Sequence, residues 1–300
     1  GRQGVDKTAN LEFTPEFAAK LGVAYGTILP ENSWVVLGTD HYPPGQKLKA
    51  ALVSGLLGSG VNLYDLGVAA TPVTRQAVVA MEAVGGIQLR VSPVAPENIL
   101  VEFFDAQGLL INREMERKVE QAFFAEEFRR AALDRLGQIR NVDEFSARYL
   151  ENILKATARE EIRAARYKAV VGVDPVDGPL DSLLTTVLTA LGCATVAFEA
   201  DAACSYRTVA DVRKACLPSL AKQVRRERAD FGVLLASNGE CLILVDGEGG
   251  VVEEEQFTAL LSLLVLKYGG AGTIPLPVTA PQFIKEVIQA NRGEVVWTKA

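Results

Sequence analysis

Two residue types that build reactive centres are scarce in this sequence. His41 is the only histidine among 300 residues, and the four cysteines form no CxxC pair. A metal cluster of several histidines is therefore excluded, and a Ser-His-Asp triad would have to use His41. The cysteine pattern is typical of reduced thiols rather than of a disulfide framework or a zinc site.

Long apolar runs and an excess of positive charge are missing too. No stretch approaches the ~20 apolar residues that a membrane-spanning helix needs, and no signal peptide is recognisable. The formal net charge is −6, which argues against nucleic acid or an anionic membrane as a partner. We therefore expect a cytoplasmic protein in which an anionic ligand needs a local basic pocket.

The composition is that of an ordinary globular protein, and the sequence pattern predicts strands that alternate with helices. Hydrophobic residues make up 49% of the chain and charged residues 23%, and the length suggests two or three domains. Short apolar strands are expected at 35–38 and 61–66. Thr14-Pro15 and Thr71-Pro72 each read as a helix start with threonine as the N-cap. This alternation predicts an α/β fold with a largely parallel sheet.

Two later helices are placed from similar patterns. Pro218 is expected to open a helix that runs to Arg228, because proline is favoured at the first helical position. In a further helix after Gly250, the apolar residues Phe257, Leu260, Leu261 and Leu264 are expected to face the core.

The stretch 86–104, GIQLRVSPVAPENILVEFF, reads as a strand, a loop stiffened by two prolines and a returning strand. Period-two alternation places Arg90 and Ser92 on the same face of the first strand. A serine at the mouth of a strand beside a guanidinium is suited to carry or bind phosphate. Two alternatives stay open: Ser92 caps a turn, and Arg90 pairs with Glu102 on the neighbouring strand.

This stretch resembles the phosphoserine loop of the α-D-phosphohexomutases, the phosphomannomutase/phosphoglucomutase family. The family pattern, GG-V-x-I-T-A-S-H-N-P-P-x-x-N-G-I-K-F-F, lies on residues 85–104 without a gap, and Ser92 falls on the phosphorylated serine. Pro93 stands where the family has a histidine, Glu102 where it has a lysine, and Asp6, near the start, where it has an arginine. The resemblance implies consecutive α/β/α domains with mostly parallel mixed sheets. It also implies an isomerase-type intramolecular transfer of phosphate on hexose phosphates through Ser92.

A second stretch, 229–246, is similar to the family's A-D-L-G-I-A-x-D-G-D-A-D-R-L-x-x-V-D, in which three aspartates hold Mg²⁺. The matching positions here are Ala236, Asn238 and Glu240. One carboxylate and one amide make a poor magnesium site, so we expect no cofactor, or Mg²⁺ only if the family site is partly retained. The flanking apolar runs predict paired strands around a hairpin turn.

The chain ends on a stretch that resembles the family's P-V-T-x-S…G-G-x-V-x-R-T-K-V-G, with Lys299 on its lysine. Lys299 and Arg90 are the candidate phosphate-binding residues. We expect a phosphoserine-loop domain at 1–140, a second domain with a degenerate metal loop at 141–248, and the start of a truncated third domain at 249–300. The family's fourth domain is expected to be absent.

Two functional classes remain. The resemblance implies a phosphohexomutase acting on hexose phosphate, but the altered positions lead us to expect that this chain alone is inactive. The alternative is a non-catalytic module that binds sugar phosphate or a partner. Because the R-V-S-P loop resembles mutase-like halves fused to sugar-1-phosphate nucleotidyltransferases of the mannose-1-phosphate guanylyltransferase type, such a fused domain is the predicted partner.

Overall fold

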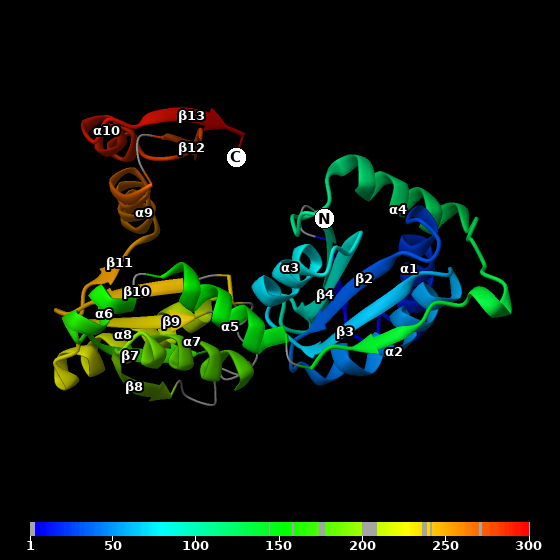
Figure 1. Cartoon of the computed structure of the whole chain (residues 1–300), viewed down its shortest axis with the longest axis horizontal. Helices are drawn as coiled ribbons and strands as arrows, with labels where there is room; N and C mark the ends of the chain where they lie inside the picture. The colour runs from blue at the N-terminus through cyan, green and yellow to red at the C-terminus, as the bar shows by residue number, and fades with distance from the viewer. Residues whose placement is uncertain are drawn as a thin grey trace.

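The fold is described from a computed structural model, which covers residues 4–143, 145–157, 159–173, 178–199, 209–235, 239–240, 242–269 and 272–299. It contains three sheets of six, five and two strands, which follow one another along the chain (Figure 1). Helices lie between the strands, and most neighbouring strands are parallel. The predicted α/β class with mostly parallel mixed sheets is confirmed. Within the described ranges, no helix is both long and apolar enough to cross a membrane.

The first sheet has the strand order β1-β5-β4-β2-β3-β6. Strands β4, β2, β3 and β6 are parallel, whereas β5 runs antiparallel to both β4 and β1. The six strands are β1 (Val5–Thr8), β2 (Trp34–Thr39), β3 (Asn62–Val68), β4 (Gly85–Val91), β5 (Asn98–Asp105) and β6 (Ile139–Asn141). The predicted strand pair on either side of the serine loop is therefore β4 and β5.

Four α-helices and one short 3₁₀ turn belong to this first unit: α1 (Pro15–Ile28), α2 (Pro43–Gly58), α3 (Thr71–Ala80), α4 (Arg113–Ala125) and η1 (Leu133–Arg135). The capping predicted for α1 is confirmed, since Thr14 Oγ1 accepts a hydrogen bond from the Phe17 amide at 3.2 Å. The prediction for α3 is wrong in its cap. Thr71 is already helical, Ala70 is the N-cap, and Thr71 Oγ1 is buried without a partner among the described residues.

The second sheet has the order β11-β10-β9-β7-β8. Its strands are β7 (Lys168–Val173), β8 (Ala194–Glu199), β9 (Phe231–Leu235), β10 (Leu242–Asp246) and β11 (Val251–Val252). Its helices are α5 (Phe145–Ala156), α6 (Arg159–Ala165), α7 (Gly178–Ala190) and α8 (Val209–Glu227). Strands β9 and β10 form the antiparallel pair that the sequence predicts. Most of the turn between them lies outside the described residues.

Pro218 does not open a helix, contrary to the prediction. It lies inside α8, which already begins at Val209 in the described part of the chain. Cys216, Leu220 and Val224 are buried on one side of α8, at a spacing of four residues, while Pro218 is exposed. Packing of that stripe outweighs the backbone hydrogen bond that proline cannot donate.

The third unit consists of α9 (Glu254–Tyr268), β12 (Thr273–Pro277), α10 (Gln282–Ala290) and β13 (Glu294–Thr298). The two strands pair in parallel, as expected for an α/β unit. The predicted core face of α9 is wrong for three of its four residues: Phe257 is half-buried, but Leu260, Leu261 and Leu264 are exposed. The buried face consists of Ala259, Ser262 and Leu266, at helical spacing. A sheet of only two strands leaves the wider apolar stripe of α9 uncovered.

Candidate functional site

Ser92 lies immediately after β4, at the point where the chain leaves the sheet. Its Oγ donates a hydrogen bond to Asp6 Oδ2 at 2.7 Å and accepts one from the Val94 amide at 3.4 Å. Its backbone amide donates to the Asn98 carbonyl at 3.1 Å, which closes the loop onto β5. Ser92 is only 2% exposed. The loop therefore holds the hydroxyl in one orientation, towards a carboxylate.

Asp6 reaches Ser92 from β1, 86 residues away in sequence. Its second oxygen, Oδ1, accepts a hydrogen bond from Asn98 Nδ2 at 2.8 Å. Because both carboxylate oxygens accept hydrogen bonds, the side chain is held at the serine. The sequence analysis did not predict this partner. The only signal was an aspartate at a position where the resembled family has an arginine.

Asp40 follows β2 and connects it to the end of β4. Its Oδ2 accepts a hydrogen bond from the Val91 amide at 2.6 Å, and its Oδ1 accepts one from the Tyr42 amide at 2.9 Å. Burial raises the pKa of the Asp40 carboxyl, although these two hydrogen bonds and the charge of Arg90 act in the opposite direction. Parallel β2 and β4 both end here, and ligands of α/β sheets bind at the carboxyl ends of such strands.

Arg90 lies on β4, two residues before the serine, and is paired with Glu102 on β5. Arg90 Nε is 2.7 Å from Glu102 Oε2, and Arg90 Nη2 is 3.1 Å from Glu102 Oε1. Both side chains are buried, at 5% and 3% exposure. Of the two interpretations of Arg90, the structure shows the ion pair. Phosphate binding by Arg90 stays a prediction.

The predicted metal positions are only partly described. Ala236 and Asn238 lie outside the described residues, whereas Glu240 pairs with Arg75 of α3, with 2.7 Å between Glu240 Oε1 and Arg75 Nη1. Arg75 Nε also donates to the Gly108 carbonyl at 2.7 Å. The donor set is an alanine, an amide and a carboxylate that already contacts a guanidinium. This set does not fit Mg²⁺, which needs several oxygen ligands and is repelled by an adjacent cation.

Lys299 lies just beyond β13 and is exposed. It therefore belongs to the third unit, whereas Ser92 and Arg90 belong to the first sheet. Among the described contacts, the side-chain partner of Ser92 is Asp6 and the side-chain partner of Arg90 is Glu102, and neither contact involves Lys299. A role for Lys299 in phosphate binding stays a prediction.

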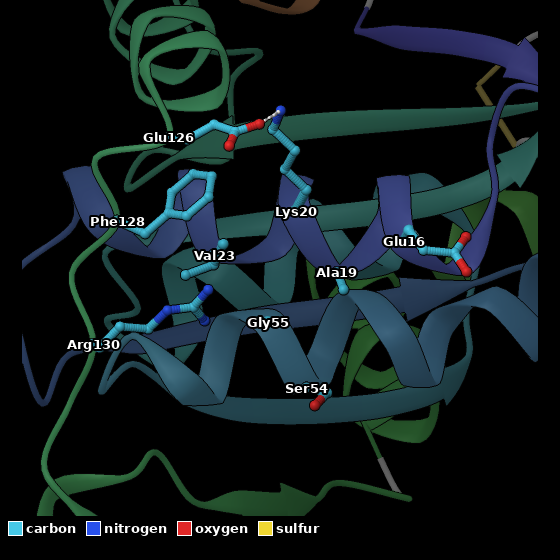
Figure 2. A pocket seen from close by; sticks show the side chains of 9 residues that line it. All are labelled: Glu16, Ala19, Lys20, Val23, Ser54, Gly55, Glu126, Phe128 and Arg130. Atoms are coloured by element: carbon cyan, nitrogen blue, oxygen red, sulfur yellow. Dashed lines mark hydrogen bonds and ion pairs between the residues drawn. The ribbon is translucent and has the colours of Figure 1, made fainter.

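The first unit contains two pockets, and Ser92 lines neither of them. The first, of about 350 Å³, lies between α1 and α2 and is shown in Figure 2. Lys20 reaches towards Glu126 at its rim, while Arg130 extends from the segment after α4, with its guanidinium carbon 5.6 Å from the centre of the Phe128 ring. The second, of about 480 Å³, lies between β1, α1 and α4, and its lining includes Asp6 and Lys7 of β1 beside apolar residues of the two helices. Lys20 and Arg130 both line the first pocket, but Lys20 is paired with Glu126.

The sequence of this chain is similar to those of known sugar-phosphate mutases. Residues 1–130 match the family described as "Phosphoglucomutase/phosphomannomutase, alpha/beta/alpha domain I". The chain is 32% identical over 305 residues to a phosphoglucomutase/phosphomannomutase of Thermococcus kodakarensis, covering all of this chain and 66% of that protein. It is 30% identical over 299 residues to a probable phosphoglucosamine mutase of Pyrococcus abyssi, covering all of this chain and 64% of that protein. The chain thus spans slightly less than two thirds of these curated relatives.

Solved structures agree on the fold. A phosphoglucomutase/phosphomannomutase family protein of Burkholderia thailandensis superposes with a TM-score of 0.78 at 20% identity, covering 99% of this chain and 65% of that one. A putative phosphomannomutase of Thermus thermophilus superposes with a TM-score of 0.78 at 19% identity, covering all of this chain and 68% of that one. The sequence similarities show that the chain belongs to the α-D-phosphohexomutase family, which includes the phosphomannomutases and phosphoglucomutases.

Proposed function

We propose that this chain is the serine-loop part of a hexose-phosphate mutase, in which Ser92 accepts and returns the phosphoryl group. The observation that carries the proposal is the fixed hydroxyl of Ser92 at the carboxyl end of β4, at the position of the family's phosphoserine. The substrate class, hexose phosphate, follows from the family and from the names of the relatives, which are hexose- or hexosamine-phosphate mutases.

In the proposed reaction, Ser92 Oγ attacks the phosphorus of a sugar phosphate. The Oγ–P bond forms, the sugar O–P bond breaks, and the hydroxyl proton ends on the released sugar oxygen. Such transfers depend mainly on positioning and on compensation of the phosphate charge. Positioning comes from the hydrogen bonds of Ser92 to Asn98 and Asp6 and from the hold of Asp40 on the Val91 amide. Mg²⁺ is not assigned a step, since the residues at the family's metal positions do not fit it.

A second candidate function is binding of sugar phosphate or of a partner without turnover. Two ion pairs favour it, because each occupies a group that could have served the phosphate or the metal: Arg90 with Glu102, and Glu240 with Arg75. The partner that we propose for this second function is the predicted nucleotidyltransferase domain. We also propose that the chain divides into domains at 1–140, 141–248 and 249–300. The sequence of the full gene product tests the partner, and limited proteolysis tests the boundaries.

The deciding experiment is coupled mutase turnover with glucose or mannose 1-phosphate and a trace of the 1,6-bisphosphate. It is run on this chain and on the full-length product, each with Ser92→Ala. Ser54→Ala, a serine of the pocket in Figure 2, is the matched control. We expect turnover that depends on Ser92 in the full-length product and none in this chain alone. Absence of turnover in both, with sugar phosphate still bound, would instead establish the second function.

A further inference from the structure

The surroundings of Ser92 are unusual for a residue that carries phosphate, because they are acidic. The Ser92 hydroxyl donates a hydrogen bond to the Asp6 carboxylate at 2.7 Å. A second carboxylate, Asp40, binds the amide of Val91, the residue before the serine. The nearby guanidinium of Arg90 is already compensated by Glu102. Two carboxylates thus lie close to Ser92, without an unpaired cation among these contacts.

The Asp6 contact suits a hydroxyl and opposes a phosphate ester on the same oxygen. A hydroxyl donates its proton to a carboxylate, and such charge-assisted hydrogen bonds are among the strong ones. A phosphoserine has no proton on Oγ to donate and carries a charge of about −1.5 to −2 at neutral pH. Its oxygens would lie around Oγ, where the Asp6 carboxylate now is. Phosphorylation therefore exchanges a hydrogen bond for repulsion between like charges.

Asp6 cannot easily move away from the serine. Its other oxygen is held by Asn98 Nδ2 at 2.8 Å, and its backbone lies in β1, paired in register with Leu100 of β5. Asn98 is also the residue whose carbonyl accepts the Ser92 amide. The carboxylate, the amide and the serine loop thus form one connected network, which is complete only while Ser92 is an alcohol.

We propose that Asp6 controls the phosphorylation state of Ser92 by stabilising the free hydroxyl against phosphoserine. This inference rests on the proposed function, because it assumes that Ser92 accepts a phosphoryl group. The resting form of the protein is then the unphosphorylated one, and a sugar bisphosphate must be present to charge the serine. The exchange is balanced: Ser92–OH and hexose bisphosphate give phosphoserine and hexose monophosphate.

The test measures phosphate on Ser92 of the full-length product by intact-mass spectrometry and peptide mapping after equilibration with glucose 1,6-bisphosphate. Asp6→Asn keeps the shape of the side chain and removes its charge. Glu12→Gln is the matched control, since it removes a carboxylate from the segment after β1, where Glu12 contacts Thr8 and Lys7 rather than the serine. Ser92→Ala controls for phosphate at other positions.

We expect the ratio of phosphorylated to free Ser92 to rise about tenfold or more in Asp6→Asn and to stay at the wild-type value in Glu12→Gln. Asp6→Ala, which removes the carboxylate together with its hydrogen bonds, is expected to change the ratio in the same direction and serves if the first variant does not fold. A ratio in both Asp6 variants equal to or below that of the wild type would overturn the inference. Absence of phosphate from Ser92 in every variant would instead overturn the proposed function, and the inference with it.

Discussion

Arg90 and Glu102 form a bidentate ion pair across β4 and β5 inside the first sheet. The two nitrogen–oxygen distances are 2.7 and 3.1 Å. The two residues are not directly opposite each other in the strand register, since Arg90 is paired with Leu100 and Glu102 with Gln88. The guanidinium reaches diagonally to the carboxylate on the same face. Near Ser92, the charges of the guanidinium and the carboxylate compensate each other. Because both groups are buried, each needs the other as its counter-charge.

Removal of one partner of this pair should strongly destabilise the first unit. Glu102→Gln leaves a buried guanidinium without its counter-charge, which typically costs about 3–5 kcal/mol in free energy of unfolding. The double variant Arg90→Met, Glu102→Leu should recover much of the loss, since apolar residues avoid the desolvation of two charges. Urea denaturation in a Trp297→Phe background, with Trp34 of β2 as the fluorescent reporter, measures both changes. A double variant that is less stable than Glu102→Gln would contradict the argument.

The crossing of α1 and α2 supplies a second prediction. A methyl group on Gly55 of α2 would collide with the carbonyl oxygen of Ala19 in α1, whereas one on Gly45 would lie 3.9 Å from Asp40 Oδ1. Gly55→Ala should therefore cost about 1–3 kcal/mol through overpacking. Gly45→Ala, in the same helix, should raise stability by about 0.5–1 kcal/mol, because alanine loses less backbone entropy. Thermal unfolding of the two variants provides the comparison, and equal shifts would contradict the close approach of the helices.

The buried carboxyl of Asp40 should give stability a pH dependence of unusual sign. Desolvation raises its pKa in the folded protein above the ordinary value of 3.8. Between the unfolded and the folded pKa the native state binds more protons, so the free energy of unfolding contributed by Asp40 falls as pH rises. The contribution is fully present below pH 3.8 and is lost as pH passes upward through the folded pKa.

The Asp40→Asn variant has no carboxyl that can titrate at this position. The difference in stability between the wild type and this variant therefore isolates the contribution of Asp40. We expect the stability of the wild type relative to Asp40→Asn to decrease as the pH rises from about 4, near the ordinary pKa of aspartate, towards neutrality. Urea denaturation of both proteins at intervals of one pH unit measures the difference. A relative stability that increases over this window would mean that the folded pKa is lowered, and that the hydrogen bonds from Val91 and Tyr42 outweigh desolvation.

The Arg75–Glu240 pair leads to a prediction about magnesium. We expect no 1:1 Mg²⁺ site in the micromolar range near neutral pH, because a guanidinium contacts the carboxylate at the matched positions and the other donors are poor. Titration calorimetry on the wild type and on Glu240→Ala decides this. A micromolar site that disappears in Glu240→Ala would show that the carboxylate prefers the metal to Arg75.

Local sequence signals were enough for much of the architecture. The paired strands on either side of the serine loop were predicted, and the Arg90–Glu102 pair was one of the two open alternatives for Arg90. The cap at Thr14 followed from a hydroxyl before a proline at the first helical turn. The same reasoning was wrong at Thr71, which is already helical, and at Pro218, which lies inside α8.

The sequence alone therefore determined the α/β class, the strand pair on either side of the serine loop and the position of Ser92, since these depend on periodicity and on local turn chemistry. Only the tertiary structure decided what the site contains. Asp6 meets Ser92 across 86 residues, and Arg75 meets Glu240 across 165. Such contacts depend on strand order and on how separate units pack, and no local pattern encodes either. The acidic surroundings of Ser92 are thus a property of the folded chain.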